Sequence, residues 1–198
     1  AEAIFEKGKL VKERKGHLKE KQANGTFFEF VPDEEIFGKY SFNMEFVEKR
    51  IWNYAYLNEG LTLRLNGQEF KSDNGLFDLL NKEIEDTCLY PIGSYTGKHI
   101  RFAFTHTNGY GENHFSFVNG QYTADGGTHL NAFKEGFVKG VNDFYQESFR
   151  AEDVREGMAS AVLVKVKDPV FESQTKNKLG NTDIRQWIVE EVKAGLID

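Results

Sequence analysis

The feature that most constrains the fold is a change of hydrophobic periodicity along the second half of the chain. Residues 98–107 and 114–120 (KHIRFAFTHT and HFSFVNG) alternate apolar and polar side chains, which is typical of β-strands. From Thr128, which we expect to cap a helix, apolar side chains recur every three or four positions. This predicted buried face consists of Leu130, Phe133, Phe137, Val141, Phe144 and Tyr145. A further apolar strand is predicted at 159–166, so a long helix connects strands of one sheet.

The flanking segments give the rest of the fold class. Residues 43–58 fit a helix, and Asn66-Gly67 between alternating leucines predicts a β-hairpin. Shorter helices are predicted at 75–86, 152–157 and 182–194. The buried stripe of the first helix is predicted to contain Met44, Val47, Ile51, Tyr54 and Ala55. This order of strands, hairpins and helices predicts an α+β domain in which helices cover a mixed sheet.

The N-terminal region has a weaker pattern. Residues 7–25 are highly charged, and they fit either a solvated loop or an edge strand protected by lysines. Residues 26–32 (TFFEFVP) are predicted to form an aromatic strand that Pro32 ends. The chain opens at Ala1 without a methionine, which suggests a piece of a longer protein.

Composition excludes several classes of protein. The 198 residues are 39% hydrophobic and 28% charged, as in ordinary soluble globular proteins. A net charge of −6 argues against a broad nucleic-acid-binding surface, although a local basic patch remains compatible with it. One cysteine, Cys88, cannot form an internal disulfide, which favours a reducing cytoplasm. No apolar run approaches the ~20 residues of a membrane span.

Neither metal nor nucleophilic chemistry is indicated by the sequence. His99, His106 and His114 lie on or beside predicted strands, without cysteine or paired acidic residues at ligand spacing. We therefore predict no metal site. The chain also lacks a GxSxG motif and a plausible Cys/His pair.

The residues with the clearest chemistry lie in the loop 168–181 (DPVFESQTKNKLGN), which follows the predicted strand 159–166. Gln174 supplies an amide donor, and Lys176 supplies a positive charge two residues later. Both groups can reach the oxygens of one phosphate from an exposed loop.

Four further motifs occur in order with this loop, and together they resemble the B subunits of type IIA topoisomerases, gyrase B and topoisomerase IV B. The motifs are 25–33 (GTFFEFVPD), 55–60 (AYLNEG), 116–119 with 126–129 (SFVN and GGTH), and 152–157 (EDVREG). The resemblance runs from about residue 25 to the end of the chain.

The resemblance implies a domain organisation and an overall activity. Residues 1–31 correspond to the last strands of a GHKL-type ATPase domain, and residues 32–198 to a transducer domain. Transducers of this family resemble the second domain of a small-subunit ribosomal protein and contain a left-handed βαβ crossover. The complete protein is a bacterial, cytoplasmic enzyme that couples ATP binding and hydrolysis to the passage of one DNA duplex through another. The piece alone is expected to be inactive.

The resemblance also implies site residues. Gln174 and Lys176 contact the γ-phosphate of ATP and act in catalysis, and Thr26 lies near the adenine. The catalytic base and the Mg²⁺ ligand belong to the upstream ATPase domain. Further partners are a DNA duplex, the cleavage (A) subunit and a second copy of the same protein in an ATP-dependent homodimer.

Direct DNA contact and the particular enzyme remain open. Lys134 and Lys139 on the polar side of the long helix are candidates for DNA binding. Ala124 replaces the arginine that often precedes the acid-Gly-Gly turn in gyrases, which leans towards topoisomerase IV. The turn at 125–127 itself is interpreted as a helix-capping turn rather than a phosphate cradle.

Two alternatives are weighed against this interpretation. One is a non-enzymatic, ribosomal-protein-like module that binds RNA or protein, but such modules are usually basic and this chain is acidic. The other is the transducer of a MutL-like mismatch-repair protein, against which the QTKxKLG pattern at 174–180 argues.

Overall fold

The computed structural model describes residues 1–17, 24–84 and 86–197, and the chain divides into two compact units. Residues 1–44 form the N-terminal unit, and residues 45–198 form the sheet unit. The N-terminal unit contains an antiparallel hairpin of β1 (Glu2–Glu6) and β2 (Lys9–Arg14), then one helical turn, α1 (Glu34–Phe37). Of the two interpretations of the charged region, the strand is therefore right at Lys9–Arg14. Residues 18–23 of that region lie outside the described residues.

The aromatic strand predicted at 26–32 is wrong. Residues 24–33 have no strand, and Phe27, Phe28 and Phe30 are 83%, 84% and 72% exposed. Alternating apolar residues form a strand only where a neighbouring strand supplies hydrogen bonds. In this unit β1 and β2 pair with each other instead.

The sheet unit is built on a five-stranded sheet with the order β5-β6-β9-β7-β8. Its strands are β5 (Gly93–Thr96), β6 (Ile100–His106), β7 (Asn113–Val118), β8 (Gln121–Tyr122) and β9 (Met158–Val164). Strands β7 and β9 are parallel, and the other neighbours are antiparallel. The predicted mixed sheet is therefore confirmed, whereas the handedness of the β7–β9 crossover stays a prediction.

The predicted helices and the second hairpin also form, with ends shifted by up to about four residues. The helices are α2 (Met44–Leu57), α3 (Leu76–Glu83), α4 (Thr128–Tyr145), α5 (Ala151–Arg155) and α6 (Arg185–Gly195). The hairpin consists of β3 (Leu63–Leu65) and β4 (Gln68–Phe70), which turn at Asn66-Gly67 as the sequence predicts.

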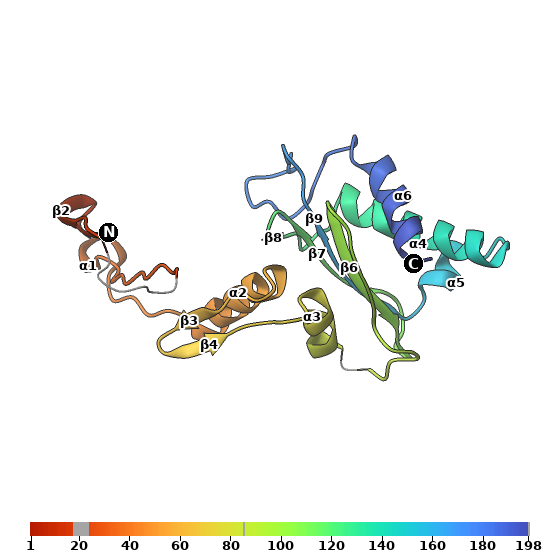
Figure 1. The fold of residues 1–198 in the computed structure, drawn as a ribbon, viewed down its shortest axis with the longest axis horizontal. Helices are drawn as coiled ribbons and strands as arrows, with labels where there is room; N and C mark the ends of the chain where they lie inside the picture. Colours follow the sequence, from red (N-terminus) through yellow and green to blue (C-terminus); the bar gives the residue numbers. More distant parts are fainter. Residues whose placement is uncertain (18–23, 85, 198) are drawn as a thin grey trace. The chain divides into compact units, whose positions relative to one another are not determined.

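Helices cover both faces of the sheet: α4 and α6 lie on one face and α3 on the other (Figure 1). All seven residues of β9 are buried, as expected for a central strand with two covered faces. Phe102 of β6 packs on the α4/α6 side, whereas Phe117 of β7 packs on the α3 side. The alternating phenylalanines of β6 and β7 thus pack against opposite faces of the sheet.

Two details of helix packing differ from the prediction. Phe144 and Tyr145, at the end of α4, are 63% and 62% exposed, and they line an apolar groove of about 470 Å³ together with Phe149. In α2, Met44 and Tyr54 are exposed. The buried residues of this helix all lie in its last turn, and Trp52 packs partly buried against the same core. Helical periodicity marks an apolar face, but how much of that face is covered depends on distant elements.

Candidate functional site

The loop that contains Gln174 and Lys176 is a narrow hairpin rather than an open loop. An isolated antiparallel bridge joins Phe171 and Leu179. The N–H of Glu172 donates to the carbonyl of Lys178 at 3.0 Å, and the N–H of Gly180 donates to the carbonyl of Val170 at 2.8 Å. These backbone bonds close the loop, so only residues 173–177 form its tip.

The tip presents the two predicted site residues together. Gln174 and Lys176 are both exposed. The N–H of Lys176 donates to the carbonyl of Ser173 at 3.1 Å, which makes a tight turn, and Lys176 has a φ of +59°. Within the described residues no hydrogen bond or ion pair involves the Lys176 ammonium, whereas the neighbouring Lys178 forms an ion pair with Glu172 at 3.0 Å. The tip therefore carries one uncompensated positive charge.

Two asparagines hold the chain where it leaves β9 and enters the loop. Asn119 donates from Nδ2 to the carbonyl of Val166 at 2.6 Å and accepts from its N–H at 2.9 Å. Asn181 accepts from the N–H of Val170 at 2.6 Å, and its Nδ2 donates to the carbonyl of Asp168 at 3.3 Å. Side-chain amides that bind backbone in this way fix both ends of the loop.

The base of the loop docks on the turn before α4. The N–H of Asp125 donates to the carbonyl of Asn177 at 3.0 Å. The N–H of Leu179 donates to the carbonyl of Gly126 at 3.1 Å, and its carbonyl accepts from the N–H of Thr128 at 3.0 Å. The turn thus binds the loop.

The helix-capping interpretation of Thr128 is wrong. The N-cap of α4 is Gly127, and the Thr128 hydroxyl donates to the carbonyl of Leu179 at 3.4 Å. Sequence reasoning missed Leu179 as the partner of this turn. The only signal was the shared presence of GGTH and KLGN, which are about 50 residues apart in the chain.

The other predicted site residues lie elsewhere. Thr26 is exposed in the irregular segment of the N-terminal unit, so it is described apart from the loop. Lys134 and Lys139 both lie on α4, but each is engaged in an ion pair. Lys134 lies 3.0 Å from Glu112, and Lys139 lies 2.7 Å from Glu135.

Glu112 collects several donors. His114 donates to it at 2.7 Å, and Arg155 donates at 3.1 Å in addition to Lys134. Burial alone would raise the pKa of the Glu112 carboxyl, but the hydrogen bonds from His114 and Lys134 outweigh it and bring the pKa to about 2. This cluster joins β7, α4 and α5 and holds Lys134 against the protein.

In the described part of the chain, no group of three or more His, Cys, Asp or Glu side chains could hold a metal ion. No helix in the described ranges is long and apolar enough to cross a membrane.

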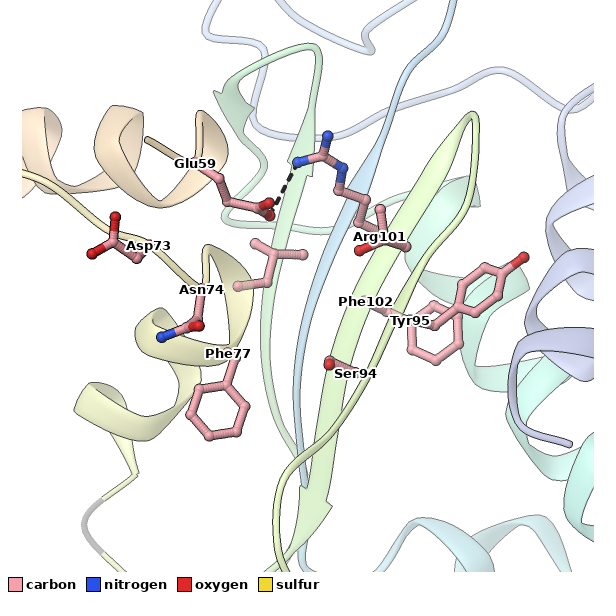
Figure 2. A pocket seen from close by; sticks show the side chains of 10 residues that line it. Glu59, Asp73, Asn74, Phe77, Ser94, Tyr95, Arg101 and Phe102 are labelled. Atoms are coloured by element: carbon pink, nitrogen blue, oxygen red, sulfur yellow. Dashed lines mark hydrogen bonds and ion pairs between the residues drawn. The ribbon is translucent and has the colours of Figure 1, made fainter. Parts of the chain in front are cut away.

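A polar cavity of about 370 Å³ lies away from the loop, between the start of α3 and the edge of the sheet. In Figure 2, Glu59 and Arg101 point toward one another, and they form an ion pair at 3.2 Å. Asp73 and Asn74, which precede α3, and Ser94 of β5 also line the cavity. None of the predicted site residues lines this cavity.

Comparison with known proteins defines the class of this fold. The 43K ATPase domain of gyrase B from Thermus thermophilus, solved in complex with an aminocoumarin, is 29% identical and superposes with a TM-score of 0.71. The match covers 84% of this chain and 50% of that chain. The gyrase B protein from Myxococcus xanthus, at 20% identity and a TM-score of 0.70, has the same fold over 83% of this chain and 58% of its own.

Sequence comparison identifies the family. A family model described as DNA gyrase B matches residues 71–198. The B subunit of DNA topoisomerase 4 from Borreliella burgdorferi is 52% identical over 193 residues, which are 97% of this chain and 32% of that protein. The B subunit of DNA gyrase from Clostridium acetobutylicum is 34% identical over 82% of this chain and 29% of its own length. The chain therefore belongs to the DNA gyrase B family, the B subunits of type IIA topoisomerases, and it spans about a third of the length of these relatives.

Proposed function

We propose that this chain transmits the state of bound ATP to the DNA-handling parts of a type II topoisomerase. Gln174 and Lys176 contact the γ-phosphate of ATP held by an upstream ATPase domain, and the sheet unit carries the resulting movement onward. The observation behind this proposal is the uncompensated ammonium of Lys176, exposed at the tip of a backbone-bonded loop.

The chemistry of the tip suits a terminal phosphate. The Lys176 ammonium supplies a full positive charge, and the Gln174 amide adds a neutral donor two residues away. In a partly dehydrated pocket, such a cation stabilises the charge that develops on a transferring phosphoryl group. ADP lacks this phosphate, so the loop has different partners before and after hydrolysis. Such a difference in contacts is what a ligand needs to shift a conformational equilibrium.

The N-terminal unit supports the proposed attachment to an ATPase domain. Phe27, Phe28 and Phe30 are largely exposed and are neighbours along the chain. Contiguous exposed apolar side chains indicate a surface that another part of the protein covers. We assign residues 1–31 to the end of the ATPase domain, with Thr26 near the adenine, and residues 32–198 to the transducer domain.

The partners follow from the family. We propose that the complete protein is cytoplasmic, forms an ATP-dependent homodimer, works with a cleavage (A) subunit and passes a DNA duplex. The donors of Gln174 and Lys176 fit phosphate oxygens. From the family resemblance we propose that the Mg²⁺ ligand belongs to the upstream ATPase domain. The 52% identity to a topoisomerase 4 relative, against 34% to a gyrase, together with Ala124, favours the topoisomerase IV type.

We also propose direct DNA contact through Lys134 and Lys139. Both lysines already form ion pairs within the protein, which would have to open for this contact. DNA phosphates would have to compete with Glu112 for Lys134 and with Glu135 for Lys139. Arg185 also binds Glu135, at 2.7 Å, so this carboxylate keeps one cation if Lys139 turns away.

The proposal is tested by replacing Lys176 in the full-length protein. We expect Lys176→Ala to lower the kcat for ATP hydrolysis by about 100-fold or more, since loss of one group that stabilises transition-state charge has this effect. Lys178→Ala is the matched control, because Lys178 lies in the same loop but forms an ion pair with Glu172. Near-normal hydrolysis by the Lys176→Ala variant would remove the proposed role of this residue.

A further inference from the structure

We propose that Gly127 is a positioning residue for Lys176: it lets the base of the loop dock directly on the N-terminus of α4. This inference rests on the proposed function and adds a second element to it. The loop tip and the start of α4 therefore move together.

Gly127 cannot be replaced by a larger residue without a steric clash. Gly127 has a φ of +122° and a ψ of −162°, a conformation that is open essentially to glycine alone. A methyl group at Gly127 would lie 2.5 Å from the backbone N of Leu179 and 2.9 Å from its Cα, with the carbonyl oxygen closer still. These are backbone atoms, so the obstruction cannot be relieved by rotating a side chain.

The residue docked against Gly127, Leu179, is held firmly in place. Leu179 is 1% exposed and belongs to the core that β6, β9, α4 and α6 share. A parallel bridge joins it to Gly127, with backbone hydrogen bonds on both sides. Moving the loop base away from α4 would therefore break these bonds and expose a buried leucine, which is costly.

Only a short stretch of backbone separates this docked segment from Lys176. Asn177 directly follows Lys176, and its carbonyl accepts from the N–H of Asp125. On the other side of the tip, the bond from Glu172 to Lys178 closes the hairpin. The backbone of Lys176 thus has no flexible linker between it and the turn before α4. When the backbone of Lys176 is displaced, the first residues of α4 are therefore displaced with it.

The test uses the full-length protein and Gly127→Ala. We expect kcat for ATP hydrolysis to fall by about 100-fold, since misplacing a reacting group by about 1 Å has an effect of this size. The KM for ATP should change little, because the nucleotide contacts upstream remain. Gly67→Ala is the control: Gly67 also has a positive φ, of +89°, but a methyl group there meets no atom within 4 Å. We expect its kcat to stay near that of the wild type.

Lys176→Ala in the same assay separates the two ideas. If Lys176→Ala retains activity, the proposed function itself is wrong. If Lys176→Ala loses activity while Gly127→Ala retains it, the lysine role stands and the positioning role of Gly127 is wrong. A rise in KM as large as the fall in kcat for Gly127→Ala would also contradict positioning, because it would mean that Gly127 affects nucleotide binding as a whole and not only the placement of Lys176.

Hydrogen exchange on the unmodified full-length protein decides the case if Gly127→Ala does not fold. We would compare ADP with a non-hydrolysable ATP analogue. The inference requires the amides of Asp125, Thr128 and Leu179 to gain protection together with that of Lys176 when the γ-phosphate is present. A change confined to the tip, with the turn at 125–128 unaffected, would overturn it.

Discussion

At the scale of single residues, His129 shows how burial fixes a protonation state. Its side chain is 0% exposed. The hydroxyl of Thr123 donates to the carbonyl of Ser116 at 2.8 Å, so Thr123 Oγ1 accepts from His129 Nε2–H at 3.1 Å. Nδ1 then carries a lone pair without a hydrogen-bond partner in the described part of the chain. Protonating Nδ1 would bury a charge, and burial accordingly lowers the pKa of His129 to about 4.

This lowered pKa gives a pH dependence with a definite sign. Because the unfolded chain binds the proton more readily, stability is complete above about pH 6.5 and falls as pH drops towards 4. The loss from His129 is at most about 3 kcal/mol. We expect urea unfolding to show this loss in the wild type and less of it in His129→Gln, which keeps a donor for Thr123 and does not titrate. Burial also lowers the pKa of His114, so only the difference between the two proteins reports on His129. Identical pH profiles would contradict this account.

At the scale of elements, the contact between α4 and α6 depends on two glycines that differ in what surrounds them. A methyl group at Gly136 would lie 2.9 Å from the carbonyl oxygen of Val189 and 3.1 Å from its Cα, both backbone atoms of α6. A methyl group at Gly140 would meet the end of the Leu196 side chain at 2.8 Å, and this side chain can move. The same substitution should therefore have opposite effects at the two sites.

We expect Gly136→Ala to lower the free energy of unfolding by about 1–3 kcal/mol, because α6 must move away from α4. Gly140→Ala should be neutral or stabilising by up to about 1 kcal/mol, because alanine has a higher helix propensity than glycine and the Leu196 side chain can move aside. Urea unfolding of both variants measures the difference. Equal destabilisation at the two positions would show that backbone contact is not the cause.

The local sequence pattern predicted those elements whose formation does not depend on one particular distant segment. Periodicity gave α4 and the strands β6, β7 and β9, and Asn66-Gly67 gave a hairpin. The strand predicted at 26–32 failed because no described strand pairs with it. Thr128 was misassigned as the helix cap for a related reason: the partner of its hydroxyl, Leu179, is 51 positions away in the sequence, and only the fold brings the two together.

At the scale of the whole molecule, the exposed Lys176 ammonium lies at one end of a continuous series of contacts that runs to α6. Lys176 lies at the loop tip, the loop base is docked on the turn before α4, and α4 packs along α6. Residue chemistry and family resemblance predicted Gln174 and Lys176 as the site. The exposure of Lys176, the pairing of Lys178 and the docking on α4 required coordinates, because they depend on contacts among segments distant in the chain.

The central claim is that Lys176 recognises the terminal phosphate of ATP, and nucleotide binding tests it most directly. The measurement is the ratio of affinities of the full-length protein for a non-hydrolysable ATP analogue and for ADP, in the wild type and in Lys176→Ala. We expect the variant to bind ADP normally and to lose about 10-fold or more in its preference for the triphosphate, within the range of typical coupling energies. An unchanged preference in Lys176→Ala would contradict the claim.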